Sequence, residues 1–124
     1  MSNKVKTFEI KEGNKAEDLQ SLKAEVFIVL GYFLIYCREK KLHAELTNIL
    51  QKFSVSKSDT HPEGRAFDTS VKVNWSKKDI DDCIEYMDEK VGHFGAISAS
   101  TGKRRVAYFH NAGLGDHFHF QVSR

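Results

Sequence analysis

The sequence predicts a single α+β domain, in which two helices and a small antiparallel sheet surround one core. Two observations predict the helices: apolar residues recur every three or four positions in the first third of the chain and again after Ser76. A third predicts the sheet, because apolar and polar residues alternate after Gly92. Helices and strands segregated in this way are typical of the α+β class. A chain of 124 residues has room for one core, so we expect one domain over residues 1–124.

The first helix is predicted to begin at Asn14 and to run for about 25 residues. Asn14 and Glu17 have the spacing of a capping box. The apolar positions that follow are Leu19, Leu22, Val26, Val29, Phe33 and Cys37. The longest apolar run has 12 residues, whereas a bilayer span needs about 20, so we expect a core helix and no membrane partner.

The second helix is predicted to begin at Ser76, which forms a capping box with Asp79, and to end at Gly92. Its apolar stripe consists of Ile80, Ile84, Met87 and Val91. Between the two helices, residues 46–53 form a candidate strand. After the second helix, alternation predicts strands over 96–98, 105–109 and 117–122, with turns at 101–103 and 113–115.

The composition excludes several classes of protein. With 40% hydrophobic and 29% charged residues, the chain does not have the composition of a disordered protein. A formal net charge of +2 and a pI near 8.5 fall short of the strongly basic balance of a nucleic-acid-binding domain. Two cysteines, Cys37 and Cys83, do not make a disulfide framework, and we expect both to be buried thiols. The first residues lack the apolar segment of a signal peptide, so we expect a cytoplasmic protein. We also expect a monomer.

Two clusters carry the candidate chemistry: residues 61–68, His-Pro-Glu-Gly-Arg-Ala-Phe-Asp, and residues 116–119, Asp-His-Phe-His. They supply the imidazoles and carboxylates that bind catalytic zinc. His61 and Asp68 are seven residues apart, so the chain between them must bend to bring both to one ion, and Gly64 provides the bend. His117 and His119 are two residues apart on a predicted strand and therefore share a face.

Together the clusters resemble the zinc peptidase superfamily that includes D-alanyl-D-alanine carboxypeptidases and dipeptidases, phage L-alanyl-D-glutamate endopeptidases and the Hedgehog signalling domain. That family has the pattern H-x-x-G-x-A-x-D, followed some tens of residues later by H-x-H or an acid-x-x-H. His61, Gly64, Ala66 and Asp68 fill the first motif, and Asp116, His117 and His119 fit both versions of the second.

The resemblance implies that His61, Asp68 and His119 bind zinc, that Asp116 is the general base and that His117 assists at the transition state. It also implies hydrolysis of a peptide bond involving a D-amino acid in peptidoglycan, by an endopeptidase or a D,D-carboxypeptidase. The short chain resembles a phage endolysin, which would stay in the host cytoplasm until it reached the cell wall.

The chain also departs from the family pattern. Asp59 stands where the family usually has serine, and the upstream segment that usually contains a substrate-binding arginine reads Ser54-Val55-Ser56-Lys57. Lys57 and Arg65 are therefore the candidate substrate-binding residues. A lysine lacks the bidentate geometry with which a guanidinium binds a carboxylate.

Two alternatives remain open from the sequence. One is a binding module that retains zinc without peptidase activity, like the Hedgehog domain. The other is a His-metal nuclease, indicated by His110, Asn111 and His117, although that fold needs a helix after the strands. The basic segment 103–105 is interpreted as a solvated turn, and His110 is close enough in sequence to line a cleft beside His117.

Overall fold

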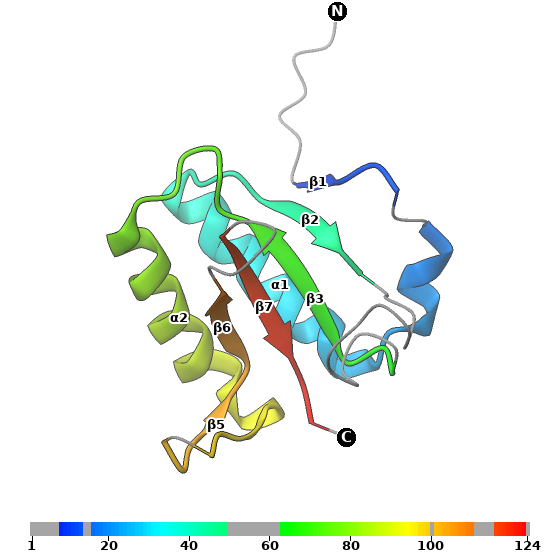
Figure 1. The fold of residues 1–124 in the computed structure, drawn as a ribbon, viewed down its shortest axis with the longest axis vertical. Helices are drawn as coiled ribbons and strands as arrows, with labels where there is room; N and C mark the ends of the chain where they lie inside the picture. The colour runs from blue at the N-terminus through cyan, green and yellow to red at the C-terminus, as the bar shows by residue number, and fades with distance from the viewer. Residues whose placement is uncertain (1–7, 14–15, 50–62, 100, 111–115, 124) are drawn as a thin grey trace, which may run out of the picture.

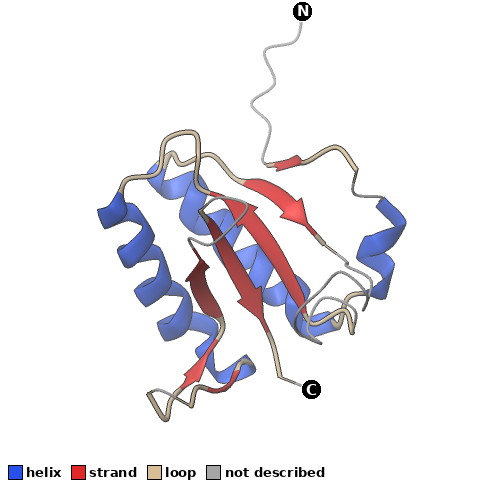
Figure 2. Cartoon of the chain, in the orientation of Figure 1, coloured by secondary structure: helices blue, strands red, loops and turns tan. Residues whose placement is uncertain are grey.

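A five-stranded sheet packed against two helices forms the body of the protein (Figures 1 and 2). The computed structural model describes residues 8–13, 16–49, 63–99, 101–110 and 116–123. The strands, in their order across the sheet, are β1 (Glu9–Ile10), β2 (Glu45–Asn48), β3 (Ala66–Ser70), β7 (His117–Gln121) and β6 (Ala107–His110). The helices are α1 (Ala24–Lys40), which passes behind the sheet in Figure 1, and α2 (Lys77–Val91), which lies beside β6 at the left of that view. The predicted α+β class is confirmed.

The sheet is mixed, so the prediction of a purely antiparallel sheet is wrong at one edge. β1 runs parallel to β2, whereas the other neighbouring pairs are antiparallel. A separate hairpin joins β4 (Ala96–Ile97) to β5 (Arg104–Arg105). Two strands were not predicted from the sequence. β1 has only two residues, and the five residues of β3 are all buried and show no alternation of apolar and polar side chains.

The prediction of one long N-terminal helix is wrong, because a break separates the 3-10 helix η1 (Ala16–Ser21) from α1. Lys23 has an extended backbone, and its N–H donates to the carbonyl oxygen of Gly64 at 2.9 Å. A residue far along the chain thus takes the hydrogen bond that a continuous helix would have made. The predicted cap at Asn14 lies outside the described residues.

Helix α2 is confirmed at both ends. The Ser76 side chain accepts from the Asp79 N–H and the Asp79 carboxylate accepts from the Ser76 N–H, which completes the capping box, and Gly92 is the C-terminal cap. The predicted strand 105–109 is divided between β5 and β6. Val106 lies between them, and its N–H donates to Oδ1 of Asp88 on α2 at 2.9 Å.

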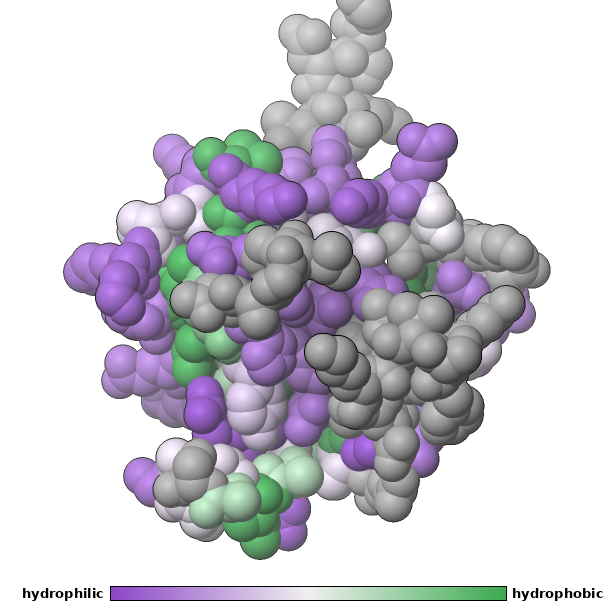
Figure 3. Space-filling model, viewed as in Figure 1, coloured by the Kyte–Doolittle hydropathy of each residue, from purple (hydrophilic) through white to green (hydrophobic). Residues whose placement is uncertain are grey.

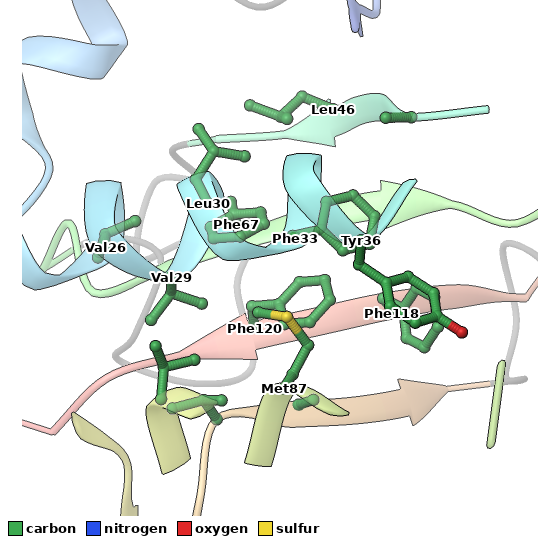
Figure 4. Close-up of a cluster of buried hydrophobic side chains, with 14 of the residues drawn as sticks. Val26, Val29, Leu30, Phe33, Tyr36, Leu46, Phe67, Met87, Phe118 and Phe120 are labelled. Carbon is green, nitrogen blue, oxygen red and sulfur yellow. The ribbon is translucent and has the colours of Figure 1, made fainter. Parts of the chain in front are cut away.

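The core lies between the helices and one face of the sheet (Figure 4). Phe67, Phe118 and Phe120 point from β3 and β7 toward Phe33 of α1, and the Phe33 and Phe120 rings are 5.0 Å apart. Cys37 and Cys83 are buried, as predicted. Burial raises the pKa of Cys37 to about 12, so its thiol stays protonated and unreactive at neutral pH.

Gly64 fixes the loop that leads into β3. Its φ is +70°, and a Cβ atom at this position would collide with the carbonyl oxygen of Ser21. Close packing against η1 therefore requires glycine here, and this packing sets where β3 begins relative to α1.

We expect Gly64→Ala to lower the free energy of unfolding by about 2–4 kcal/mol, since it adds both a left-handed alanine and an overpacked contact. Gly102 has the same φ of +70° but open space around its Cα, so Gly102→Ala is the matched control and should cost only about 1 kcal/mol. Urea denaturation of both variants measures the difference. Equal losses would show that the Ser21 contact is unimportant.

Candidate functional site

Asp68 and His119 form the centre of the candidate site. They are direct partners in the antiparallel pair β3–β7, at the middle of the sheet. Oδ1 of Asp68 and Nδ1 of His119 are 2.8 Å apart. Both residues are buried, with exposed fractions of 9% and 8%, although they belong to the face opposite the aromatic core. A buried carboxylate and imidazole in contact form a functional-site candidate on physical grounds.

Two more histidines extend this group. His117 follows the same face of β7 and pairs across the ladder with Ser70 on one side and His110 on the other. Nε2 of His117 is 4.0 Å from Oδ2 of Asp68. The His110 ring lies 5.4 Å from that of His117 and 5.5 Å from that of His119, between ring centroids. Three imidazoles therefore gather beside one carboxylate. Figure 3 views this side of the molecule, where hydrophilic residues predominate among those that are coloured.

Side-chain amides support both central residues. Nδ2 of Asn48 donates to Oδ2 of Asp68 at 3.4 Å, and Oε1 of Gln121 lies 2.8 Å from Nε2 of His119. At 2.8 Å the Nδ1–H of His119 donates to the Asp68 carboxylate, which can only accept. A metal ion between the two residues would replace that proton, and the Nε2–H could then donate to Oε1 of Gln121. A hydrogen bond of this kind to the second ring nitrogen is the usual support of a metal-binding histidine.

Asp68 and His119 fit two positions of a zinc site. Carboxylate oxygen and imidazole nitrogen are ordinary zinc ligands, and two ligand atoms about 2.0–2.1 Å from a tetrahedral ion are roughly 3.3 Å apart. The observed distance of 2.8 Å would need to increase by only about half an ångström, a shift within the reach of side-chain torsions.

The remaining predicted residues differ in their placement. His61 and Lys57 lie outside the described residues. Asp116 is exposed and lies immediately before β7, so strand alternation does not direct it away from His117 and His119. Arg65 is already engaged: its Nε is 2.7 Å from Oε1 of Glu63, and its Nη1 donates to the Val122 carbonyl at 3.0 Å. With 11% of its side chain exposed, Arg65 fastens the start of β3 to the end of β7.

Sequence reasoning missed Gln121 and Asn48. Gln121 could have been found, because it is two residues after His119 on a predicted strand and therefore shares its face. Asn48 could not, since its contact with Asp68 depends on the register shift between β2 and β3.

Comparisons of the chain with models of protein families, with curated proteins and with solved structures found no match. Within the part of the chain that the structure describes, no helix has the length and apolar character needed to cross a membrane.

Burial and neighbouring charges affect the titration of His110. Burial lowers the pKa of His110 below its ordinary value of 6.5, and the neighbouring His119 and His117 lower it further, while Asp68 opposes them. His110 is therefore neutral at pH 7 and able both to donate and to accept a hydrogen bond.

We expect NMR titration of the metal-free protein to show His110 titrating below pH 6.5, and closer to 6.5 in His117→Gln. Because the unfolded chain binds this proton more tightly, the free energy of unfolding should fall as the pH drops from about 6.5 to the lower folded pKa. His110→Gln should lose that part of the pH dependence, whereas His93→Gln, at an exposed position on η2 (Gly92–Phe94), should retain it. Titration of His110 above 6.5 would contradict the prediction.

Proposed function

We propose that the protein is a zinc-dependent peptidase that hydrolyses a peptide bond involving a D-amino acid in peptidoglycan. One observation carries the proposal: Asp68 and His119 are 51 positions apart in the sequence, yet they lie in contact at the centre of the sheet. These are two of the three residues that the sequence resemblance assigns to zinc. Their contact supports a common site for the two motifs.

His61, Asp68 and His119 would hold the ion. When bound, zinc lowers the pKa of a coordinated water and polarises a carbonyl group. The protein's own contribution begins with the amide of Gln121, which orients the His119 ring, and that of Asn48, which orients the Asp68 carboxylate.

Asp116 and His117 have positions suited to proton transfer and charge stabilisation. Asp116 is exposed at the start of β7, so its carboxylate is accessible to a water and to the leaving amine of a substrate. His117 is half-buried beside Asp68, where its imidazole can donate to an oxygen that gains negative charge. Neither residue has to bind the ion in order to act.

The class of substrate rests on the sequence resemblance. Because Arg65 is engaged by Glu63 and Val122, we assign no substrate contact to it, and among the two candidate cations the proposal retains Lys57. The same proposal includes two further points: the protein is a monomer, and it is released from the cytoplasm to act on the cell wall.

Replacing the proposed general base should lower turnover without lowering the zinc content. We expect Asp116→Asn to keep its zinc and its fold and to lose about 10²–10⁴ in turnover, the range for a general base. His119→Ala should bind one zinc fewer per chain. Zinc content is measured by elemental analysis, and activity by mass spectrometry of the new termini released from purified peptidoglycan.

His117→Ala should also keep its zinc, with a loss mainly in kcat. If Asp116→Asn strips the metal while His119→Ala retains it, the ligand assignment is wrong. A wild-type protein that binds zinc and releases no new termini would favour the binding module instead.

The exposed basic residues should affect the affinity for the cell wall more than the rate of peptide cleavage. Lys103 and Arg104 are exposed, and Nη1 of Arg104 donates to the carbonyl of Gly95, the residue before β4. Replacing both by Glu should weaken binding to anionic wall polymer in a salt-dependent way, while cleavage of a small soluble peptide stays within about threefold. A hundredfold loss on the small peptide would place these residues in the substrate site.

A further inference from the structure

We propose that Glu9, His43 and Glu45 form a second zinc site, which fastens the edge strand β1 to β2. Each residue offers one ligand atom, and the three atoms lie within 4.8 Å of one another. Nε2 of His43 is 3.7 Å from Oε2 of Glu9. Ligand atoms around tetrahedral zinc are roughly 3.3 Å apart, so side-chain torsions alone can bring this set to bonding distance.

The backbone register brings the two carboxylates together. Glu9 and Glu45 are direct partners in the parallel pair β1–β2. Two carboxylates in this relation repel each other, and the repulsion destabilises the pairing unless a cation lies between them. A divalent ion would neutralise both charges. Two carboxylate oxygens and one imidazole nitrogen suit zinc better than magnesium, which prefers oxygen ligands and retains its waters.

His43 is anchored before any ion binds. Its N–H donates to Oδ1 of Asn74 at 2.8 Å, and its carbonyl accepts from Nε1 of Trp75 at 2.8 Å. The Trp75 ring in turn stacks on Phe33 of the core. The main chain at His43 is thereby fixed to the body of the domain, and only the imidazole has to reorient.

The position of the site defines its role. β1 has two residues and lies at the edge of the sheet. Two backbone hydrogen bonds join it to the β2 segment: the Glu9 N–H donates to the Ala44 carbonyl at 2.9 Å, and the Lys11 N–H donates to the Leu46 carbonyl at 2.7 Å. A metal coordinated from both sides of this short pairing adds a link that does not depend on strand length. The site therefore stabilises the attachment of the N-terminal strand.

This site is separate from the Asp68 and His119 group. The strand β3 lies between β2 and β7. Because Leu46 pairs with Thr69 in the antiparallel ladder, the preceding residue Glu45 lies opposite Ser70. On its other side, Ser70 pairs with His117. Two strand spacings, roughly 10 Å, thus separate the Cα atoms of Glu45 and His117. Metal ions that act together on one substrate are about 3.5–4 Å apart. With three protein ligands the second zinc would hold a water in its fourth position, and its distance from the first site keeps it out of the proposed hydrolysis.

Titration with zinc chloride alone tests the proposal in a chain that carries Asp68→Asn and His119→Ala, which removes two of the three proposed ligands of the other site. We expect calorimetry to find one zinc per chain in this background, and none at the same concentrations after His43→Gln or Glu45→Gln is added. Both His43 hydrogen bonds come from its main chain, so His43→Gln leaves them in place. Glu12→Gln, at an exposed glutamate outside the group, is the matched control and should bind zinc unchanged.

Hydrogen exchange tests the role of the site. Zinc should slow exchange of the Lys11 amide, which donates to Leu46, at least tenfold in the background chain and in Glu12→Gln, but not in His43→Gln. A background chain that binds no zinc, or zinc binding that survives both His43→Gln and Glu45→Gln, would overturn the proposal. Because the background lacks the Asp68 and His119 pair, neither result depends on whether the protein is a peptidase.

Discussion

The antiparallel register between β3 and β7 is the constraint on which the core and the site both depend. It sets Phe67 opposite Phe120 on the face that packs against the helices, and Asp68 opposite His119 on the other face. Since side chains alternate along each strand, a shift by one residue would bury the polar pair in the core and expose the aromatic rings. Apolar packing therefore secures the geometry of the candidate site, and neither can change without the other.

The elements that could be predicted from the sequence are those whose signals are local. The capping box at Ser76 and the glycine cap at Gly92 bound α2, and both are contained within a few residues. The start of α1 depends instead on the hydrogen bond between Lys23 and Gly64, which no local pattern reveals. β3 has no alternation because it is covered on both faces, and β1 is too short to have a period.

The same distinction applies to the candidate site. Strand periodicity was enough to predict that His117 and His119 share a face, and their row includes Gln121 for the same reason. The partner of each histidine was not accessible from periodicity, because Asp68 reaches His119 through the register of distant strands. The engagement of Arg65 by Glu63 and Val122, and the parallel pairing of Glu9 with Glu45, likewise exist only in the folded chain.

The order of the strands has a consequence for how the protein folds. β3 and β7 are neighbours at the centre of the sheet, but α2, the β4–β5 hairpin and β6 separate them along the chain. Pairing them closes a long loop, whose entropy must be lost before the contacts form, whereas α2 and the hairpin need only nearby residues. A partly folded chain with both helices in place would still lack the pair, and the acid and imidazole at the centre of the sheet would meet only when this long-range pairing forms.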